Sequence, residues 1–194
     1  MSTVGVLSYQ GGFQRHRETI ERMGIPVLEV RDLEALAVVD ALVIPGGEST
    51  TIGMLMQRFG LLDELRRRID DGFPVYGSCA GAILLARRIE ASDQPRIGAM
   101  DMTVRRNAYG RQVESFEADV EPTGEGGWPG GPFHGVFIRA PQIVDIGADV
   151  TPLLVYEDRP VLVRSHTLLA TTFHPELTRD ERIHRYFVEE VAGM

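Results

Sequence analysis

Residues 74–86 read PVYGSCAGAILLA and contain Cys79, the only cysteine of the chain. An apolar run leads into Gly77-Ser78-Cys79-Ala80-Gly81 and an apolar helical pattern follows it, which predicts a strand, a sharp turn and a helix. Small residues two positions on either side of the cysteine suit so tight a turn, because Cβ atoms there would collide. The first turn of the helix would direct unpaired N–H groups at the sulfur and favour a thiolate. We therefore interpret Cys79 as a presented nucleophile rather than a small buried hydrophobe.

The first half of the chain alternates short apolar runs with amphipathic stretches. Strands are predicted over residues 4–7, 26–30, 41–44 and 74–76, and helices over residues 13–23, 52–58 and 61–71. Strands separated by helices pair in parallel, with helices on both faces of the sheet. Ligands bind such sheets beyond the carboxyl ends of the strands. Two turns fall at such ends, the Gly46-Gly47 turn and the one that carries Cys79.

The second half has short apolar runs with few helical spacers, which favours antiparallel pairing. These runs cover residues 102–104, 115–120, 135–138, 153–156 and 168–173, and a closing helix is predicted over residues 179–191. Residues 121–132, with five glycines and three prolines, are typical of a surface loop. We expect one α/β domain over residues 1–194, with a mostly parallel central sheet, helices on both faces and a more antiparallel second half.

The composition excludes several classes of protein. At 194 residues, 43% hydrophobic and 25% charged, the chain is an ordinary globular protein. A net charge of −8 argues against a nucleic-acid binder. One cysteine permits no internal disulfide, and no stretch is long and apolar enough for a signal peptide or a membrane span. We therefore expect a cytoplasmic protein that binds neither nucleic acid nor membrane.

A nucleophilic cysteine needs a base, and His174 is the histidine best placed to serve. It directly follows the last predicted strand, so at the carboxyl edge of the sheet it would lie beside Cys79. Glu176 comes two residues later, and in an extended segment positions i and i+2 point the same way. Its carboxylate could accept the Nδ1–H of His174 and stabilise the imidazolium, while Pro175 holds the extended geometry. The other histidines are interpreted as surface or hydrogen-bonded structural residues: His16, His134, His166 and His184.

Attack on a carbonyl places negative charge on its oxygen, and preorganised N–H donors commonly stabilise it, each by about 3 kcal/mol of barrier. The N–H of Ala80, directly after the nucleophile, is one candidate donor. The Gly46-Gly47 turn is predicted to supply the other, because a backbone without side chains can approach a substrate closely. The same turn opens a helix for which Ser49 or Thr50 is the expected N-cap.

Together these residues resemble the class I, triad-type glutamine amidotransferases, with GSCAG (77–81) as the cysteine elbow and HPE (174–176) as the His-x-Glu. The resemblance narrows to the glutaminase subunits of pyridoxal 5'-phosphate synthase and runs from end to end. The segments that carry it are GVLSYQG (5–11), PGGESTT (45–51), RNAYGRQ (106–112), GVFIRAP (135–141) and FHPELT (173–178). Residues 121–132 depart from the pattern, being longer and richer in glycine than the family usually has there.

The resemblance implies a flavodoxin-like fold and hydrolysis of L-glutamine to L-glutamate and ammonia. The ammonia would pass to a separate barrel-shaped synthase subunit that makes pyridoxal 5'-phosphate, and no metal or cofactor is implied for this chain. The implied catalytic residues are Cys79, His174 and Glu176, with Gly47 and Ala80 in the oxyanion hole. The implied glutamine-binding residues are Gly47, Glu48, Ser49, Arg106, Ile138 and Arg139. A guanidinium suits a bidentate grip on a carboxylate, although without the resemblance both arginines would be interpreted as surface ion pairs.

Other functions fit the same residues. The chain could be the glutaminase of another biosynthetic pair, such as one of histidine or tryptophan synthesis, which the subunit-specific segments argue against. It could also be a non-catalytic module that senses glutamine, which the intact set of Cys79, His174 and Glu176 disfavours. A cysteine-dependent peptidase or amidase on a similar sheet is the most distant alternative.

Overall fold

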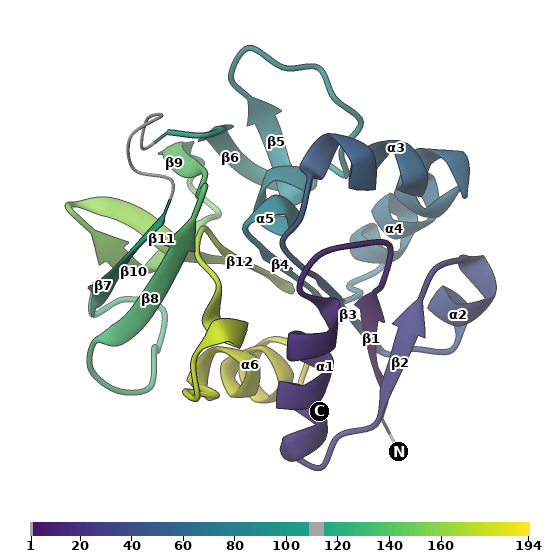
Figure 1. Ribbon diagram of the computed structural model, residues 1–194, viewed down its shortest axis with the longest axis horizontal. Coiled ribbons are helices and arrows are strands. Elements are labelled where there is room, and N and C mark those ends of the chain that lie inside the picture. The colour runs from purple at the N-terminus through teal and green to yellow at the C-terminus, as the bar shows by residue number, and fades with distance from the viewer. Residues whose placement is uncertain (1, 109–114) are drawn as a thin grey trace.

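A computed structural model describes residues 2–108 and 115–194, and its centre is a nine-stranded mixed sheet (Figure 1). The strand order is β2-β1-β3-β4-β12-β11-β10-β7-β8. The strands are β1 (Val4–Leu7), β2 (Val27–Val30), β3 (Ala41–Ile44), β4 (Val75–Ser78), β7 (Ser115–Pro122), β8 (Phe133–Ile138), β10 (Thr151–Tyr156), β11 (Arg159–Ser165) and β12 (Leu168–Thr171). Residues 109–112, which complete the RNAYGRQ motif, lie outside the described residues.

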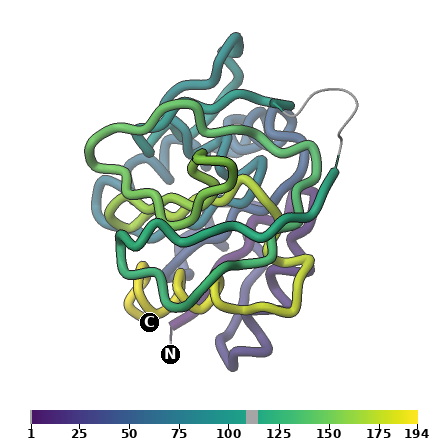
Figure 2. The backbone as a smooth tube through the Cα atoms, turned by 90° about the vertical axis from the view of Figure 1, so that its left-hand side faces the viewer, coloured from purple at the N-terminus to yellow at the C-terminus, as the bar shows by residue number. Residues whose placement is uncertain are grey.

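Parallel and antiparallel pairing divide this sheet into two halves. The strands from β2 to β12 in the sheet order pair in parallel, and those from β12 to β8 pair antiparallel. The antiparallel half, in teal and green, faces the viewer in Figure 2. The expected α/β fold, with parallel strands first and antiparallel strands in the second half, is confirmed.

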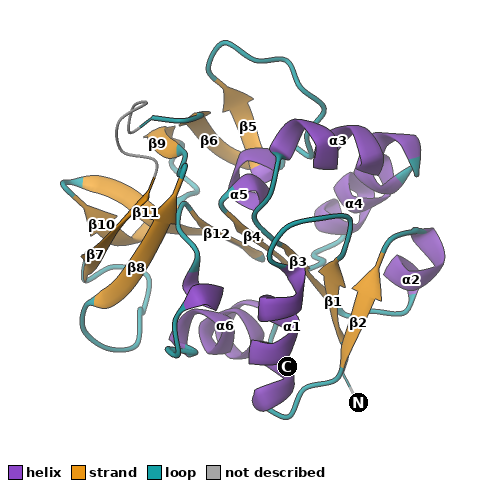
Figure 3. Ribbon diagram, in the orientation of Figure 1, coloured by secondary structure: helices purple, strands orange, loops and turns teal. Residues whose placement is uncertain are grey.

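Helices cover both faces of the parallel half (Figure 3). In β3, Leu42 and Ile44 belong to the apolar cluster under α3, α4 and α5, whereas Ala41 and Val43 belong to the cluster under α1 and α6. The helices are α1 (Phe13–Arg22), α2 (Leu33–Ala37), α3 (Ser49–Arg58), α4 (Leu61–Asp70), α5 (Ala80–Leu85) and α6 (Arg182–Tyr186), which continues as a π-helical turn, η2 (Phe187–Val191). No helix within residues 2–108 and 115–194 is long and apolar enough to cross a membrane.

Several elements are absent from the prediction. A second sheet joins β5 (Ala86–Ile89), β6 (Met100–Arg105) and β9 (Gln142–Ile146), of which only β6 was expected. β5 begins where α5 ends, so its short alternation merges with the helical pattern. The strand β11 and the helix α2 are also new. α2 has a clear N-cap, Asp32, which accepts the N–H of Ala35 at 2.8 Å, but it is too short to show a helical period.

The stretch rich in glycine and proline forms a surface loop, as expected. β7 extends through Pro122, and residues 123–132 are half-buried or exposed. Tyr186 donates a hydrogen bond to the carbonyl of Gly126 at 2.8 Å, and Arg182 donates one to the carbonyl of Pro132 at 2.9 Å. Side chains of α6 therefore anchor this loop at Gly126 and at its C-terminal end.

Candidate active site

The turn at Cys79 has the predicted geometry. Cys79 follows β4 and precedes α5 with φ 50° and ψ −100°, a conformation that residues with side chains rarely adopt. A Cβ at Gly77 would lie 2.5 Å from the carbonyl carbon of Gly81, and one at Gly81 would collide with the carbonyl oxygen of Ile44. The elbow therefore requires glycine at both positions.

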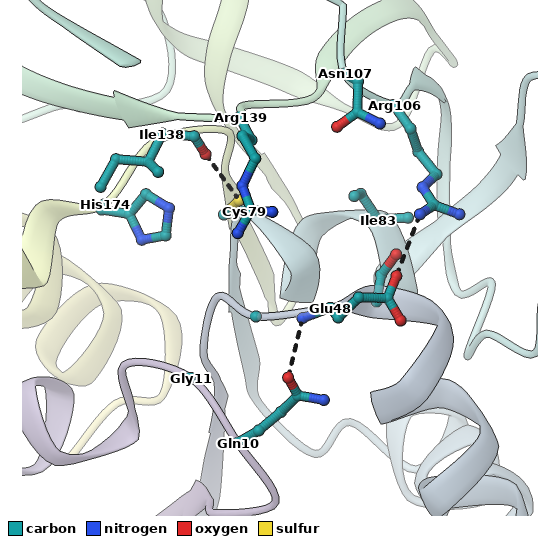
Figure 4. A pocket seen from close by; sticks show the side chains of 12 residues that line it. Gln10, Gly11, Glu48, Cys79, Ile83, Arg106, Asn107, Ile138, Arg139 and His174 are labelled. Atoms are coloured by element: carbon teal, nitrogen blue, oxygen red, sulfur yellow. Dashed lines mark hydrogen bonds and ion pairs between the residues drawn. The ribbon is translucent and has the colours of Figure 1, made fainter. Parts of the chain in front are cut away.

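Neighbouring parallel strands bring the predicted residues to one edge of the sheet. β4 lies between β3 and β12 and pairs with both in parallel. The Gly46-Gly47 turn follows β3, Cys79 follows β4, and His174 lies beyond the end of β12. These ends border a pocket of about 430 Å³ (Figure 4). Its lining residues are Gln10, Gly11, Gly47, Glu48, Ser49, Cys79, Ile83, Arg106, Asn107, Ile138, Arg139 and His174.

His174 and Glu176 form a hydrogen-bonded pair at this edge. Nδ1 of His174 lies 2.8 Å from Oε1 of Glu176, whose side chain is 1% exposed. The pairing is as predicted, but the reason given for it is wrong, because the segment is not extended. Pro175–Leu177 form a 3-10 turn that carries the carboxylate back toward the imidazole. The N–H of His174 donates to the carbonyl of Val136 at 2.8 Å, which ties this turn to β8.

Neighbouring groups shift the pKa values of His174 and Glu176. Burial alone would lower the pKa of His174, but interactions with Cys79 and Glu176 outweigh burial and raise that pKa to about 10. Burial would raise the pKa of Glu176, but the neighbouring His16 and His174 lower it to about 2. At neutral pH the pair is an imidazolium beside a carboxylate, so the histidine holds a proton that it can transfer.

The Gly46-Gly47 turn lies directly against the imidazole. A Cβ at Gly46 would stand 2.5 Å from Cε1 of His174. Gly47 has φ 153°, a value that other residues rarely adopt. The side chain of Gln10 approaches the same turn, where its Oε1 accepts the N–H of Glu48 at 3.4 Å. Glycine at these two positions lets the backbone touch the histidine and line the pocket.

Glu48 is the N-cap of α3, so the expectation of Ser49 or Thr50 is wrong. Its carboxylate accepts the N–H of Thr50 at 3.2 Å and the N–H of Thr51 at 2.7 Å. Burial would raise the pKa of Glu48, but these hydrogen bonds outweigh it and lower the pKa. The helix begins at Ser49, before its apolar periodicity starts, which is why the cap was misplaced. The Glu48 carboxylate is therefore hydrogen-bonded to the first turn of α3.

Arg106 is held at the same end of α3. Nη1 of its guanidinium donates to Oε1 of Gln94 at 2.7 Å and to Oγ1 of Thr50 at 3.1 Å, and Nη2 lies 3.2 Å from Oε1 of Glu48. Gln94 is buried and also accepts the hydroxyl of Ser49 at 3.3 Å. Arg106 therefore lines the pocket as a member of an ion pair, with part of its charge already compensated.

Arg139, the second arginine of the pocket, differs from Arg106 in its contacts. It is exposed, it lines the pocket, and within the part of the chain that the structure describes it has no hydrogen-bond or ion-pair partner. Its φ is 43°, and its side chain lines the same pocket as Cys79 (Figure 4). The carbonyl of the preceding Ile138 accepts the Sγ–H of Cys79 at 3.9 Å. The guanidinium of Arg139 is thus free to bind a carboxylate.

Two predicted residues do not line the pocket. Ala80 is the first residue of α5 and is 1% exposed, and Glu176 is buried behind His174. Four residues that the prediction did not single out line the pocket: Gln10, Gly11, Ile83 and Asn107. A fifth, Gln94, supports the pocket from behind through its hydrogen bond with Arg106. The first two follow β1, so the rule of parallel strand ends could have found them. Among the residues described here, no three His, Cys, Asp or Glu side chains are grouped to hold a metal ion.

Comparison with known proteins identifies the family. A model of the SNO glutamine amidotransferase family matches residues 6–193. The chain belongs to the SNO glutamine amidotransferase family. This SNO-family chain is 56% identical over 189 residues to the "Pyridoxal 5'-phosphate synthase subunit PdxT" of Roseiflexus sp. (strain RS-1), covering 96% of this chain and 98% of the relative. It is 53% identical over 193 residues to the protein of the same name from Thermus thermophilus, covering 98% of each.

A solved structure agrees with these relatives. The crystal structure of a glutamine amidotransferase is 51% identical in sequence and superposes with a TM-score of 0.91, covering 98% of the SNO-family chain and 99% of the other. The resemblance drawn from the cysteine elbow, the His-x-Glu and the subunit-specific segments is therefore confirmed.

Proposed function

We propose that this SNO-family chain hydrolyses L-glutamine to L-glutamate and ammonia, with Cys79 as the nucleophile. His174 is its base, and Glu176 orients that base. The observation that carries the proposal is the 2.8 Å contact between Nδ1 of His174 and Oε1 of Glu176 at the strand edge that presents Cys79. A nucleophile, a base and a group that orients the base are the parts that acyl transfer requires.

The reaction proceeds through a thioester. His174 takes the proton of the Cys79 thiol, the thiolate Sγ attacks the side-chain amide carbon of glutamine, and His174 then gives its Nε2 proton to the amide nitrogen. The C–N bond breaks, ammonia leaves, and a γ-glutamyl thioester remains on Cys79. Water then attacks the thioester while His174 takes its proton, the C–S bond breaks, and glutamate departs. Glu176 stays ionised throughout and holds the Nδ1–H of the imidazole.

The pocket supplies charge and donors for this chemistry. In the proposal, the N–H groups of Gly47 and Ala80 hold the oxyanion, each contributing about 3 kcal/mol to the barrier reduction. Arg139 binds the α-carboxylate of glutamine, because its guanidinium lines the pocket and has no partner in the part of the chain that the structure describes. The rest of the glutamine-binding surface is formed by Glu48, Ser49, Arg106 and Ile138.

The second part of the proposal concerns the fate of ammonia. Ammonia released into neutral water becomes ammonium and is no longer a nucleophile, so its use requires a dry path into a partner. The relatives described above are named as subunits of pyridoxal 5'-phosphate synthase. We therefore assign the barrel-shaped synthase subunit of that enzyme as the partner, in the cytoplasm and in vitamin B6 biosynthesis. The isolated chain is expected to be nearly inactive.

A glutaminase assay with and without the synthase subunit tests both parts. Turnover should require the subunit and should be lost in Cys79→Ala, and turnover retained in that variant would exclude the mechanism. With amide-¹⁵N-glutamine, label should enter pyridoxal 5'-phosphate. A glutamine-analogue electrophile separates the enzyme from a glutamine-sensing module, because only a nucleophilic Cys79 forms the adduct.

A further inference from the structure

A buried histidine lies behind the pair of His174 and Glu176. His16 of α1 is 0% exposed, and its Nε2 lies 3.3 Å from Oε2 of Glu176. This is the carboxylate oxygen that His174 does not contact, and within residues 2–108 and 115–194 it has no hydrogen-bond partner. The buried carboxylate therefore lies between two imidazoles, one at each oxygen.

His16 has further partners that fix the position of its proton. Its Nε2 lies 3.0 Å from Oγ of Ser78, and its Nδ1 lies 2.8 Å from Nε2 of His184 on α6. His184 is also fully buried, and its Nδ1 has no partner among the described residues. Burial lowers the pKa of His16, and it lowers the pKa of His184 to about 3, so each ring carries a single proton at neutral pH.

The placement of these protons follows from the contacts. If the proton of the His16 ring were on Nδ1, that N–H would donate to Nε2 of His184. The proton of the His184 ring would then lie on Nδ1 of His184, where it would be unpaired. The lone pair at Nε2 of His16 would also face the charge of Glu176. Both consequences are costly inside a protein. With the proton on Nε2, His16 accepts the Nε2–H of His184 and directs its own N–H between Ser78 and Glu176.

We propose that His16 is a positioning residue for the glutaminase reaction, acting through Glu176; the inference rests on the function proposed above. Its Nε2–H, hydrogen-bonded to Ser78 and 3.3 Å from the outer oxygen of the carboxylate, stabilises the charge on that oxygen electrostatically, so the inner oxygen stays turned toward Nδ1 of His174. Ser78 directly precedes Cys79, so the same N–H also connects the elbow to α1. His16 does not line the pocket and touches no reacting atom.

The other groups near this carboxylate have partners of their own. The ring of Tyr76 lies edge-on to His16, at 5.9 Å between centroids, and its hydroxyl is paired with Thr171 at 2.9 Å. Arg22, which lies on α1 with His16, forms an ion pair with Glu181 at 3.0 Å. Apart from the backbone N–H of Glu176, which also helps to lower the pKa of this carboxylate, the Nε2–H of His16 is the donor that faces its outer oxygen.

Substitutions at His16 separate positioning from packing. His16→Gln places an amide nitrogen near the position of Nε2, His16→Asn places one near Nδ1, and His16→Leu keeps the bulk without an N–H. In the complex with the synthase subunit, His16→Gln should retain most of the wild-type kcat. His16→Asn and His16→Leu should lower kcat by about 10- to 100-fold, the loss typical of residues that orient a site from behind. KM for glutamine should change little, because His16 does not touch the substrate.

Equal losses in all three variants would show a packing role and overturn the proposal. A rise in KM without a fall in kcat would overturn it as well. The matched control is His134→Gln, a change at an exposed histidine paired with Glu117 and Asp119, which should leave both constants unchanged.

A second readout does not depend on turnover, and its first measurement, made on the wild type, does not depend on the variants folding. In free wild-type protein, ¹⁵N chemical shifts should report His16 as the Nε2–H tautomer, and the Nδ1–H tautomer would overturn the proposal. The ¹³C-labelled carboxyl of Glu176 should titrate at higher pH in His16→Leu than in the wild type or in His16→Gln, because a donor to the anion has been removed. Failure of the proposed function would instead appear as absence of turnover in the wild-type complex.

Discussion

Gly46 and His174, from the ends of two strands that flank β4, lie so close that a Cβ at Gly46 would stand 2.5 Å from Cε1 and 3.1 Å from Nδ1 of the imidazole. The same Cβ would be 3.5 Å from the Cβ of Cys79. The glycine therefore sets the space in which the imidazole and the thiol meet, and it does so with backbone atoms alone.

Gly46→Ala should inactivate the protein without unfolding it. The added methyl group must displace the imidazole, and a misplacement of about 1 Å can cost about 100-fold in rate. Glutaminase turnover in the complex should fall by that factor, while thermal unfolding shifts only slightly. Gly131→Ala is the control, because a Cβ there meets nothing within 4 Å. Full activity in Gly46→Ala would show that the histidine can move without consequence.

The two pocket arginines should differ in their effects on substrate binding. Arg139 has no partner among residues 2–108 and 115–194, whereas Arg106 is already paired with Glu48. A hydrogen bond to a charged group contributes about 1.5–3 kcal/mol, so Arg139→Ala should raise KM for glutamine by roughly 10- to 150-fold. Arg139→Lys should recover part of this loss. Arg105→Ala, which removes a surface ion pair with Glu90, should leave KM unchanged, and an unchanged KM in Arg139→Ala would refute the assignment of the carboxylate.

The N-cap of α3 makes a prediction about stability. Glu48→Ala removes the acceptor for the N–H groups of Thr50 and Thr51, and loss of a cap typically costs about 1 kcal/mol. Urea unfolding should show this decrease in the free energy of unfolding. Glu48→Gln keeps a side-chain oxygen and should lose less. If Ser49→Ala proved more destabilising than Glu48→Ala, the assignment of the cap would be wrong.

The raised pKa of His174 predicts a pH-dependent contribution to stability. Its pKa is about 10 in the folded protein against an ordinary value of 6.5, so the folded state binds the proton more tightly. The contribution is fully present below pH 6.5 and is lost as the pH rises through 10. His174→Gln should therefore destabilise the protein more at pH 6 than above pH 10, by at least about 1.4 kcal/mol, the equivalent of one pKa unit. Equal destabilisation at both pH values would contradict the raised pKa, and His166→Asn, in an exposed turn, serves as the control.

The features that could be predicted from the sequence are those that depend on residues close together in the chain. The glycines around Cys79 and the order of strand, turn and helix depend on neighbours in the chain, so the elbow and its place in a parallel sheet could be predicted. The rule of strand ends then predicts that His174 lies near Cys79.

Contacts between distant segments could not be predicted in the same way. His16 was interpreted as ordinary because a helical period shows only that it lies on a helix. The contacts of its two ring nitrogens depend on η1 (Pro175–Leu177) and on α6, which bring Glu176 and His184 to His16. Gln94 was missed for the same reason, because nothing in its own surroundings in the sequence indicates that Arg106 binds to it.

The position of β12 has a consequence for how the protein is made. β12 is the last strand in the chain, yet it lies between β4 and β11 and joins the parallel half of the sheet to the antiparallel half. Until it is inserted, the sheet consists of two pieces with open edges, and Cys79 has no histidine beside it. A polypeptide emerging from the ribosome therefore carries Cys79 without His174 while residues 80–173 are being added. Insertion of β12 completes the sheet and brings His174 to Cys79, so these two residues can meet only after the last strand has been made.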